Sequence, residues 1–254
     1  MWFVRFASLA LVPLLVGPAY GVDITMCGQV VPAGETGVLQ ADLSGCSRNP
    51  GVTVGDGGSV LLNGHSITST APGANGIVCE GGCLVQGPGK ISVDYGIVHS
   101  SHLRRQSLRV EDVDFEDNGG VAVLSIEGFV FARNVTVTGN GFEHVDPSNV
   151  TIAVHAYRGL FGKNLTVTNN GGVGIDTIRL KLIDSVVTGN NGWDIIAFRR
   201  PRLVHSTCGK SEGRYPPRPL RHGAYSLLPW GVCTGDPPRR TATSARVASA
   251  SPVP

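Results

Sequence analysis

The sequence predicts an all-β protein folded as a right-handed, single-stranded parallel β-helix, a solenoid of about seven coils. Three observations predict this fold class. Related segments recur at steps of 22, 30 and 20 residues, Gly accounts for 35 of the 254 residues, and charged residues are only 16% of the chain. A repeat near 20 residues is typical of solenoids. Abundant Gly with few charges indicates a turn-rich β protein rather than a helical bundle.

The repeat consists of an apolar column and an Asn column three residues later. The members are Phe115, Val137, Val167 and Val187, and then Asn118, Asn140, Asn170 and Asn190. Short alternating strands between Gly and Asn turns fit one coil of a parallel β-helix, with coils stacked ~4.8 Å apart. We expect the apolar column to face inward and the Asn side chains to form an amide ladder. A leucine-rich repeat has a similar period, but its Leu and Asn spacing is missing.

The two ends of the chain differ from the repeat region. Residues 1–21 combine Arg5, the apolar stretch LALVPLLV and a small-residue site ending at Gly21, which predicts a secretory signal peptide. A membrane anchor is the alternative, but Pro and Gly interrupt the run before it reaches ~20 apolar residues. Residues 22–233 form the predicted β-helix domain. Residues 234–254 are rich in Pro, Ser, Ala and Arg, which predicts a disordered tail.

The charge is unevenly distributed along the chain. The net charge is only +2, so no strong overall attraction to nucleic acid or to a membrane follows. From Arg199 onward, however, the chain contains ten Lys/Arg residues and only two Asp/Glu residues. No second apolar run is long enough to span a membrane, so we expect a protein that is secreted, on the cell surface or periplasmic.

Six Cys residues in an exported chain suggest three disulfides, for which fifteen pairings exist. Proximity in the sequence favours Cys27–Cys46, Cys79–Cys83 and Cys208–Cys233. A zinc site is the alternative, but no second short Cys pair or His pair stands at ligand spacing.

The coil motifs resemble those of a known group of proteins. The NxGxGI-type coils, the opening coil DGGSVLLNGHSI and the Cys-bounded start are similar to exported right-handed parallel β-helix proteins of the pectin-lyase-like superfamily. The resemblance covers roughly residues 25–210 and implies the fold. Members of that superfamily include polysaccharide lyases, hydrolases and uronate epimerases, so it also implies an acidic polysaccharide as partner without identifying the activity.

The register of the coils predicts which residues point outward. The inward column is Ile77, Ile97, Val123, Val154, Ile175 and Ile195, and the next, outward column is Val78, Val98, Leu124, His155, Asp176 and Ile196. His155 and Asp176 then lie on neighbouring coils, ~5 Å apart. Three residues further along the chain, Glu127, Arg158, Arg179 and Arg199 form another column, with Tyr157 beside Arg158.

This arrangement predicts a groove for an acidic glycan. Stacked Arg158, Arg179 and Arg199 would bind uronate carboxylates, which makes the sugar C5 proton removable. His155, oriented by Asp176, would act as the base and Tyr157 as the acid, the roles that β-elimination or C5 epimerisation requires. An ordinary solvated face is the alternative, and a register error of one residue would separate the pair.

Two further groups of residues are candidate parts of the site. The 30-residue step contains an insertion, residues 142–149, whose His144 and Asp146 we expect to bind substrate from a loop. The acidic segment from Glu111 to Asp117 places Asp112, Asp114 and Glu116 on one face by strand alternation, a candidate Ca²⁺ site. A solvated acidic face is favoured, because the column continues as Asn134, Thr136 and Thr138. We therefore expect no cofactor, with Ca²⁺ as the one candidate metal.

The sequence thus predicts a secreted protein that binds an acidic polysaccharide, and lyase or C5-epimerase chemistry on that polymer is one concrete form of this hypothesis. The alternative is a non-catalytic surface or envelope protein with a binding or structural role.

Overall fold

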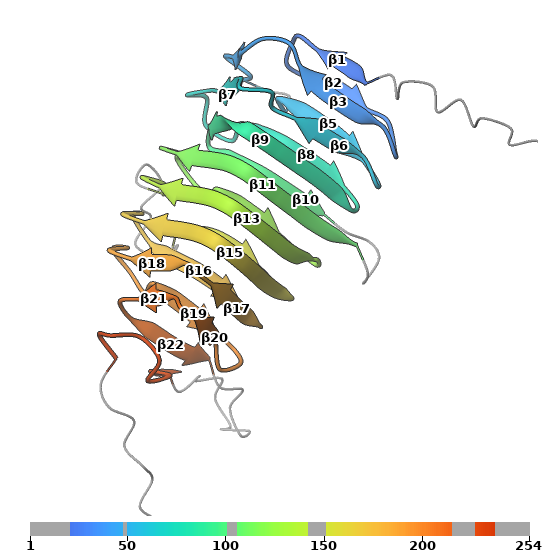
Figure 1. Ribbon diagram of the computed structural model, residues 1–254. Helices are drawn as coiled ribbons and strands as arrows, with labels where there is room; N and C mark the ends of the chain where they lie inside the picture. Colours follow the sequence, from blue (N-terminus) through green and yellow to red (C-terminus); the bar gives the residue numbers. More distant parts are fainter. Residues whose placement is uncertain (1–20, 48–49, 101–105, 142–150, 215–226, 237–254) are drawn as a thin grey trace, which may run out of the picture.

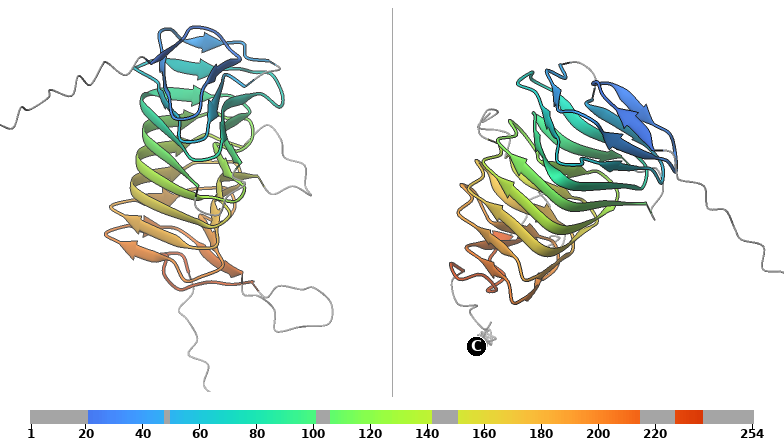
Figure 2. Two further views of the ribbon diagram at one scale, coloured as in Figure 1. Left: turned by 90° about the vertical axis from the view of Figure 1, so that its right-hand side faces the viewer. Right: turned by 45° about the horizontal axis from the view of Figure 1, so that its top comes forward.

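The computed structural model describes residues 21–47, 50–100, 106–141, 151–214 and 227–236, and all of its regular structure is β. The strands stack coil upon coil along one axis, from β1 at one end to β22 at the other (Figure 1). The result is a parallel β-solenoid of about seven turns, as predicted. The left-hand view of Figure 2 shows from another side how the coils lie over one another along the length of the solenoid.

Two sheets form the sides of the solenoid, and we call the larger one sheet A and the smaller one sheet B. Sheet B contains β2 (Gln29–Val31), β5 (Val52–Gly55), β8 (Asn75–Glu80), β10 (Tyr95–Ser100), β12 (Val123–Ser125), β14 (Ile152–Ala156), β16 (Val173–Thr177), β19 (Ile195–Ala197), β22 (Ser211–Arg214) and β23 (Leu227–Leu228). All pairings between described strands are parallel except that of β22 with β23.

Sheet A contains the strands that alternate with those of sheet B along the chain. They are β1 (Val22–Ile24), β3 (Thr36–Leu39), β4 (Leu43–Ser44), β6 (Ser59–Leu61), β7 (Ser66–Thr68), β9 (Cys83–Ser92), β11 (Ser107–Glu116), β13 (Phe129–Thr138), β15 (Gly159–Thr168), β17 (Leu180–Ile183), β18 (Val186–Thr188), β20 (Arg202–Val204) and β21 (Thr207–Cys208).

Sheet A bends along a line that divides it into a first half and a second half. The bend lies at Asp112, Asn134 and Asn164 within the long strands, and at Asp184 and His205 between the shorter ones; all five have positive φ. Asn and Asp tolerate this left-handed conformation better than most side chains. Asn134 donates to Asp112 Oδ1 at 2.7 Å and Asn164 donates to Asn134 Oδ1 at 2.9 Å, so side-chain hydrogen bonds connect the bend from coil to coil.

The inward columns have the predicted register. Phe115 pairs with Val137, Val137 with Val167 and Val167 with Val187, and all four are fully buried. On sheet B, the column from Ile77 to Ile195 is also paired throughout, and none of its members is more than 3% exposed. Alternation with period two thus identifies the core correctly in these strands.

The predicted Asn ladder is present and buried. Each amide nitrogen donates to the Oδ1 of the next coil's Asn: Asn118 to Asn140 at 2.6 Å, Asn140 to Asn170 at 2.8 Å and Asn170 to Asn190 at 2.7 Å. The ladder ends at Asp194, whose carboxylate accepts from Asn190 Nδ2 at 2.7 Å and from the Lys210 backbone nitrogen at 2.8 Å. The ladder crosses the 30-residue step without a break, so the two coils that flank this step keep their register.

All three predicted disulfides are present, which accounts for all six cysteines. Cys27–Cys46 lies in the first coil, Cys79–Cys83 joins β8 to β9, and Cys208–Cys233 ties the last described segment to β21. Strand β1 begins at Val22, directly after the predicted cleavage position. Residues 1–20 and 237–254, which hold most of the predicted signal peptide and tail, lie outside the described residues.

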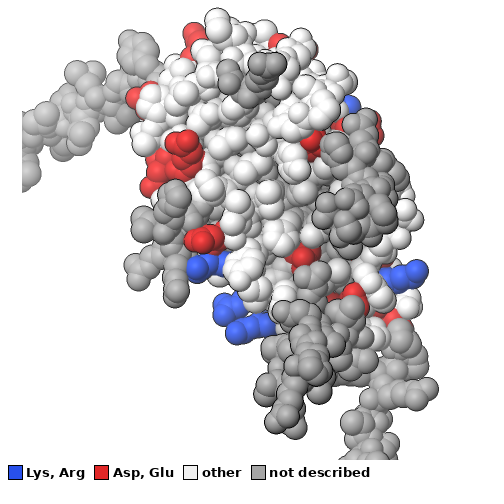
Figure 3. All heavy atoms as spheres, turned by 180° about the vertical axis from the view of Figure 1, so that it is seen from behind, with Lys and Arg blue, Asp and Glu red and all other residues white. Residues whose placement is uncertain are grey.

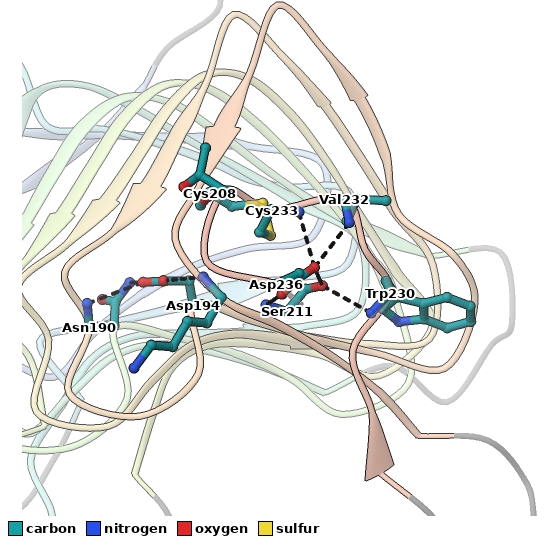
Figure 4. The surroundings of a disulfide bond; sticks show 10 residues. Asn190, Asp194, Cys208, Ser211, Trp230, Val232, Cys233 and Asp236 are labelled. Carbon is teal, nitrogen blue, oxygen red and sulfur yellow. Dashed lines mark hydrogen bonds between the residues drawn. A yellow bond between two sulfur atoms is a disulfide. The ribbon is translucent and has the colours of Figure 1, made fainter. Parts of the chain in front are cut away.

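A cap built around Asp236 covers the C-terminal coil (Figure 4). Its carboxylate accepts from the Ser211 backbone nitrogen at 2.6 Å, from the Ser211 hydroxyl, and from the nitrogens of Val232 and Cys233 at 3.0 Å each. Trp230 is 5% exposed, and its indole nitrogen donates to the Ala197 carbonyl. The folded contacts therefore continue three residues beyond the boundary expected at residue 233.

We predict that Asn140→Ala lowers the free energy of unfolding by about 3 kcal/mol, because it leaves the buried backbone N–H of Asn118 without its acceptor and its side-chain amide with the Ile91 carbonyl alone. Asn191→Ala, at an exposed Asn in the adjoining turn, is the control and should change stability by less than about 0.5 kcal/mol. Urea unfolding followed by circular dichroism measures both. Equal stabilities of the two variants would contradict a structural role for the ladder.

The cap predicts a loss of stability in acid. Burial raises the pKa of Asp236, but hydrogen bonds from Ser211, Cys233 and Val232 outweigh it and hold the pKa below its ordinary value of 3.8. The stabilising contribution of the Asp236 carboxylate is therefore complete above pH 3.8. It is lost as the pH falls through the lower pKa that Asp236 has in the folded state. Compared with the wild type, Asp236→Ala should be less stable near neutral pH, and the difference should shrink below about pH 4. Thermal unfolding across this range tests it, and a difference that is independent of pH would be the contrary result.

Candidate functional site

The candidate site lies on the outer surface of sheet B, in its C-terminal half. The outward column runs in register through Val78, Val98, Leu124, His155, Asp176 and Ile196, and continues at Glu212. The register therefore places His155 directly opposite Asp176 on the neighbouring strand. This juxtaposition is what the sequence predicted, although the structure does not test the roles assigned to the two residues.

The imidazole and the carboxylate face each other in a largely dry environment. His155 Nδ1 lies 3.5 Å from Asp176 Oδ2, and their side chains are 27% and 5% exposed. Asp176 points away from the core, yet it is nearly as buried as a core residue, and its neighbours Ile196 and Glu212 are 4% and 5% exposed. The Nδ1 atom of His155 is buried, so the accessible part of the ring excludes that nitrogen.

The remaining predicted residues lie in the turns that lead from sheet B to sheet A. Tyr157 follows β14 and is 55% exposed. Arg158 is half-buried, whereas Arg179 and Arg199 are exposed. The backbone nitrogen of Arg199 donates to the Ile178 carbonyl at 3.0 Å, which stacks the turn of Arg199 on that of Arg179. Figure 3 shows most Lys and Arg atoms of the face it displays in the lower half, where the C-terminal coils lie.

The alignment of Arg158 with Arg179 changes within the turn. Sheet B pairs Ala156 with Thr177, which would place Arg158 beside Arg179. Sheet A pairs Leu160 with Leu180, which instead places Gly159 beside Arg179. The turn after β16 is therefore one residue shorter than the turn after β14. The arginines share one corner of the solenoid, but they do not form a ladder with the regularity of the strands.

The other predicted contributors are separate from this site. His144 and Asp146 lie outside the described residues, so their assignment to substrate binding stays a prediction. The expectation that Asp112, Asp114 and Glu116 share one face is wrong, because Asp112 has a φ of 58° and sits at the bend of sheet A. The pairing of β11 with β9 shifts between Glu111 and Val113, which breaks the alternation of period two.

Protein donors already contact several of these acidic groups. Glu111 Oε2 lies 2.7 Å from Arg133 Nη2, and Glu116 Oε2 lies 2.5 Å from Lys90 Nζ. Within the described ranges, no group of three or more His, Cys, Asp or Glu side chains is arranged to hold a metal ion. The described residues likewise include no helix with the length and hydropathy required to cross a membrane.

Two features of the structure were not identified from the sequence. The first is a stacked pair of aromatic rings on sheet A, formed by the exposed Phe131 and the half-buried Phe161. Both occur at the same position of their coils, 30 residues apart, so the repeat could have predicted that the two rings lie side by side. The second is His99, which faces inward from β10 and is fully buried. Its Nδ1 lies 2.8 Å from Ser125 Oγ on the next coil.

Comparison of the chain with protein-family models, with curated proteins and with solved structures finds no match.

The inward position of His99 predicts a second pH dependence. Burial lowers the pKa of His99 from its ordinary value of 6.5, and a hydrogen bond with the Gly81 backbone opposes this in part. As the pH falls below 6.5, the His99 side chain binds a proton in the unfolded chain before it does so in the folded protein. The folded state therefore loses stability as the pH falls toward the lower pKa of His99 in the folded state. His99→Gln should therefore reduce the change in unfolding free energy between about pH 7 and pH 5.

The control for this prediction is His205→Asn, which removes an imidazole from a side chain that is 83% exposed. Asn tolerates the positive φ at position 205, so this variant removes an exposed imidazole without straining the backbone. Urea unfolding at a series of pH values provides the comparison. Identical slopes for His99→Gln and the wild type would show that the buried imidazole is not responsible.

Proposed function

We propose that this protein is an exported β-solenoid that binds an acidic polysaccharide at the corner formed by His155, Asp176, Arg179 and Arg199. The observation that carries the proposal is the pairing of an accessible imidazole with a buried carboxylate beside two exposed guanidinium groups on neighbouring coils. Guanidinium groups bind carboxylates in a planar, two-bond geometry. Repeated carboxylates along a polyuronate match cations that repeat from coil to coil.

Export is supported by two independent features. Three disulfides are typical of proteins that fold in oxidising compartments, and the first strand begins directly after the predicted signal-peptide cleavage position. The likeness of the coil motifs to pectin-lyase-like proteins adds support for a polysaccharide as the partner.

The catalytic form of the proposal is β-elimination or C5 epimerisation. In elimination, the His155 imidazole takes the C5 proton, the electron pair forms the C4–C5 double bond, and the C4–O4 bond breaks with a proton supplied by the Tyr157 hydroxyl. In epimerisation, the His155 imidazole removes the C5 proton from one face and the Tyr157 hydroxyl returns a proton to the opposite face. In both reactions an arginine paired with the uronate carboxylate stabilises the carbanion that develops at C5.

A binding protein without catalytic activity is the second candidate. It is favoured by the distance of 3.5 Å between His155 Nδ1 and Asp176 Oδ2, which is longer than a normal hydrogen bond of this type. An imidazole that is not held by its carboxylate is a poorly oriented base. The arginines would serve the same binding role in either case.

We predict that proton NMR of residues 22–254 incubated with alginate, pectate or glycosaminoglycans, with and without Ca²⁺, shows new vinylic signals or altered anomeric signals. Vinylic signals report elimination, and altered anomeric signals report epimerisation. His155→Ala should abolish either change, whereas the matched His205→Asn should not. Unchanged spectra with all polymers would contradict the proposed elimination or epimerisation and leave binding as the function.

Binding is tested separately from turnover with Arg179→Ala/Arg199→Ala. The double variant should bind the polyuronate at least about tenfold more weakly, because each lost charge-assisted contact is worth roughly 1.5–3 kcal/mol before solvent screening. Lys90→Ala/Lys210→Ala removes the same charge away from this corner and serves as the control. An equal loss in both variants would indicate a general charge effect and not a site.

A further inference from the structure

An outward column on the first half of sheet A carries aromatic and cationic side chains. Its members pair in register as Arg109, Phe131, Phe161, Lys181 and Arg202. The rings of Phe131 and Phe161 are stacked, with centroids 5.2 Å apart and planes inclined by 12°. Phe131 is 41% exposed, and the Arg109 guanidinium lies 6.0 Å from its ring centroid. This surface is distinct from the His155 corner.

A hollow of about 220 Å³ lies against the two rings. Phe131, Phe161 and Lys181 line one side of the hollow, and Glu111, Arg133 and Lys163 come from the column two residues further along the strands. The hollow is thus a groove between two outward columns that crosses four consecutive coils. Its volume is below the ~300–1,000 Å³ of pockets for drug-sized ligands, which suits a single ring of a longer chain.

The charges in the hollow are unbalanced. Three cations and one carboxylate line it, and Glu111 is already paired with Arg133 at 2.7 Å. Among the described residues, no carboxylate lies within ion-pair distance of Lys163 or Lys181. These two lysines are therefore available to an anionic ligand that also contacts the rings.

We propose that this hollow binds a carboxylate-bearing sugar residue of an acidic polysaccharide. The apolar C–H face of a pyranose packs against Phe131 and Phe161, and its carboxylate pairs with Lys163 and Lys181. The inference rests on the proposed function for the class of ligand, and it adds a second binding surface on a different sheet. A polymer held at both surfaces would bind more tightly than at either one alone.

The geometry disfavours the other occupants of a cationic aromatic surface. Single-stranded nucleic acid is held by bases stacked on separate aromatic side chains. Here the two rings are stacked on each other, so no base fits between them. A second copy of the chain would have to bring acidic groups to match the free lysines, and a neutral glycan would leave both lysines unpaired.

The test is calorimetric titration of the full chain with a short oligogalacturonate and with its methyl-esterified, uncharged analogue. Phe161→Ala and Lys163→Ala should each weaken binding of the acidic oligomer about tenfold, as expected for loss of one ring contact or one ion pair. Phe161→Tyr keeps the ring and should retain wild-type affinity, and Lys210→Ala is the control for charge. Circular dichroism checks that each variant is folded.

The outcomes separate this inference from the proposed function. Loss of affinity in Phe161→Ala and Lys163→Ala, with retention in Phe161→Tyr and Lys210→Ala, supports the hollow. Binding that depends only on Arg179 and Arg199 overturns the hollow and leaves the proposed function intact. No binding of polyuronate by the wild type overturns both. Equal affinity for the esterified analogue, or tighter binding of a single-stranded oligonucleotide at the same residues, overturns the assigned ligand.

Discussion

The registration of one coil upon the next is the constraint on which the rest of the structure depends, and the buried amide ladder is the interaction that enforces it. Each Asn from Asn118 to Asn190 is both donor and acceptor to its neighbours, and Asp194 closes the chain with a carboxylate. A slip of one residue between coils would leave several buried polar groups without partners, which is far more costly than a slip between apolar surfaces.

Registration also determines where function can reside. Because coils superpose position by position, one type of side chain repeated in successive coils becomes a continuous line on the surface. The insertion in the 30-residue coil does not disturb this relationship, since Thr138 still pairs with Thr168. The outer surface can therefore vary, as long as the inward columns and the ladder are preserved. The His155–Asp176 pair and the Phe131–Phe161 pair are both consequences of this superposition.

The sequence predicted the fold and the His155–Asp176 juxtaposition because both depend on strand alternation and a visible repeat. It failed at Asp112, where positive φ interrupts the alternation, and at Arg158, where the turn after β16 is a residue shorter. Bends and turns are set by local backbone conformation, which period-two counting does not describe. The cap formed by Trp230 and Asp236 was missed for another reason, since it belongs to no repeat and arises from tertiary packing alone.

The two proposed surfaces are neighbours around one corner of the solenoid. Arg179 lies in the turn after β16, and Lys181, on β17, follows it by only two residues, a span of at most roughly 7 Å along the chain. In the next coil, Arg202 on β20 follows Arg199 by three residues. Cations thus continue from the outer surface of sheet B onto that of sheet A. The buried acids Asp176 and Glu212 also belong to the outward column of sheet B. A polyanion that crosses this corner would meet guanidinium groups first and the aromatic hollow next, without an intervening acidic surface in the described part of these turns.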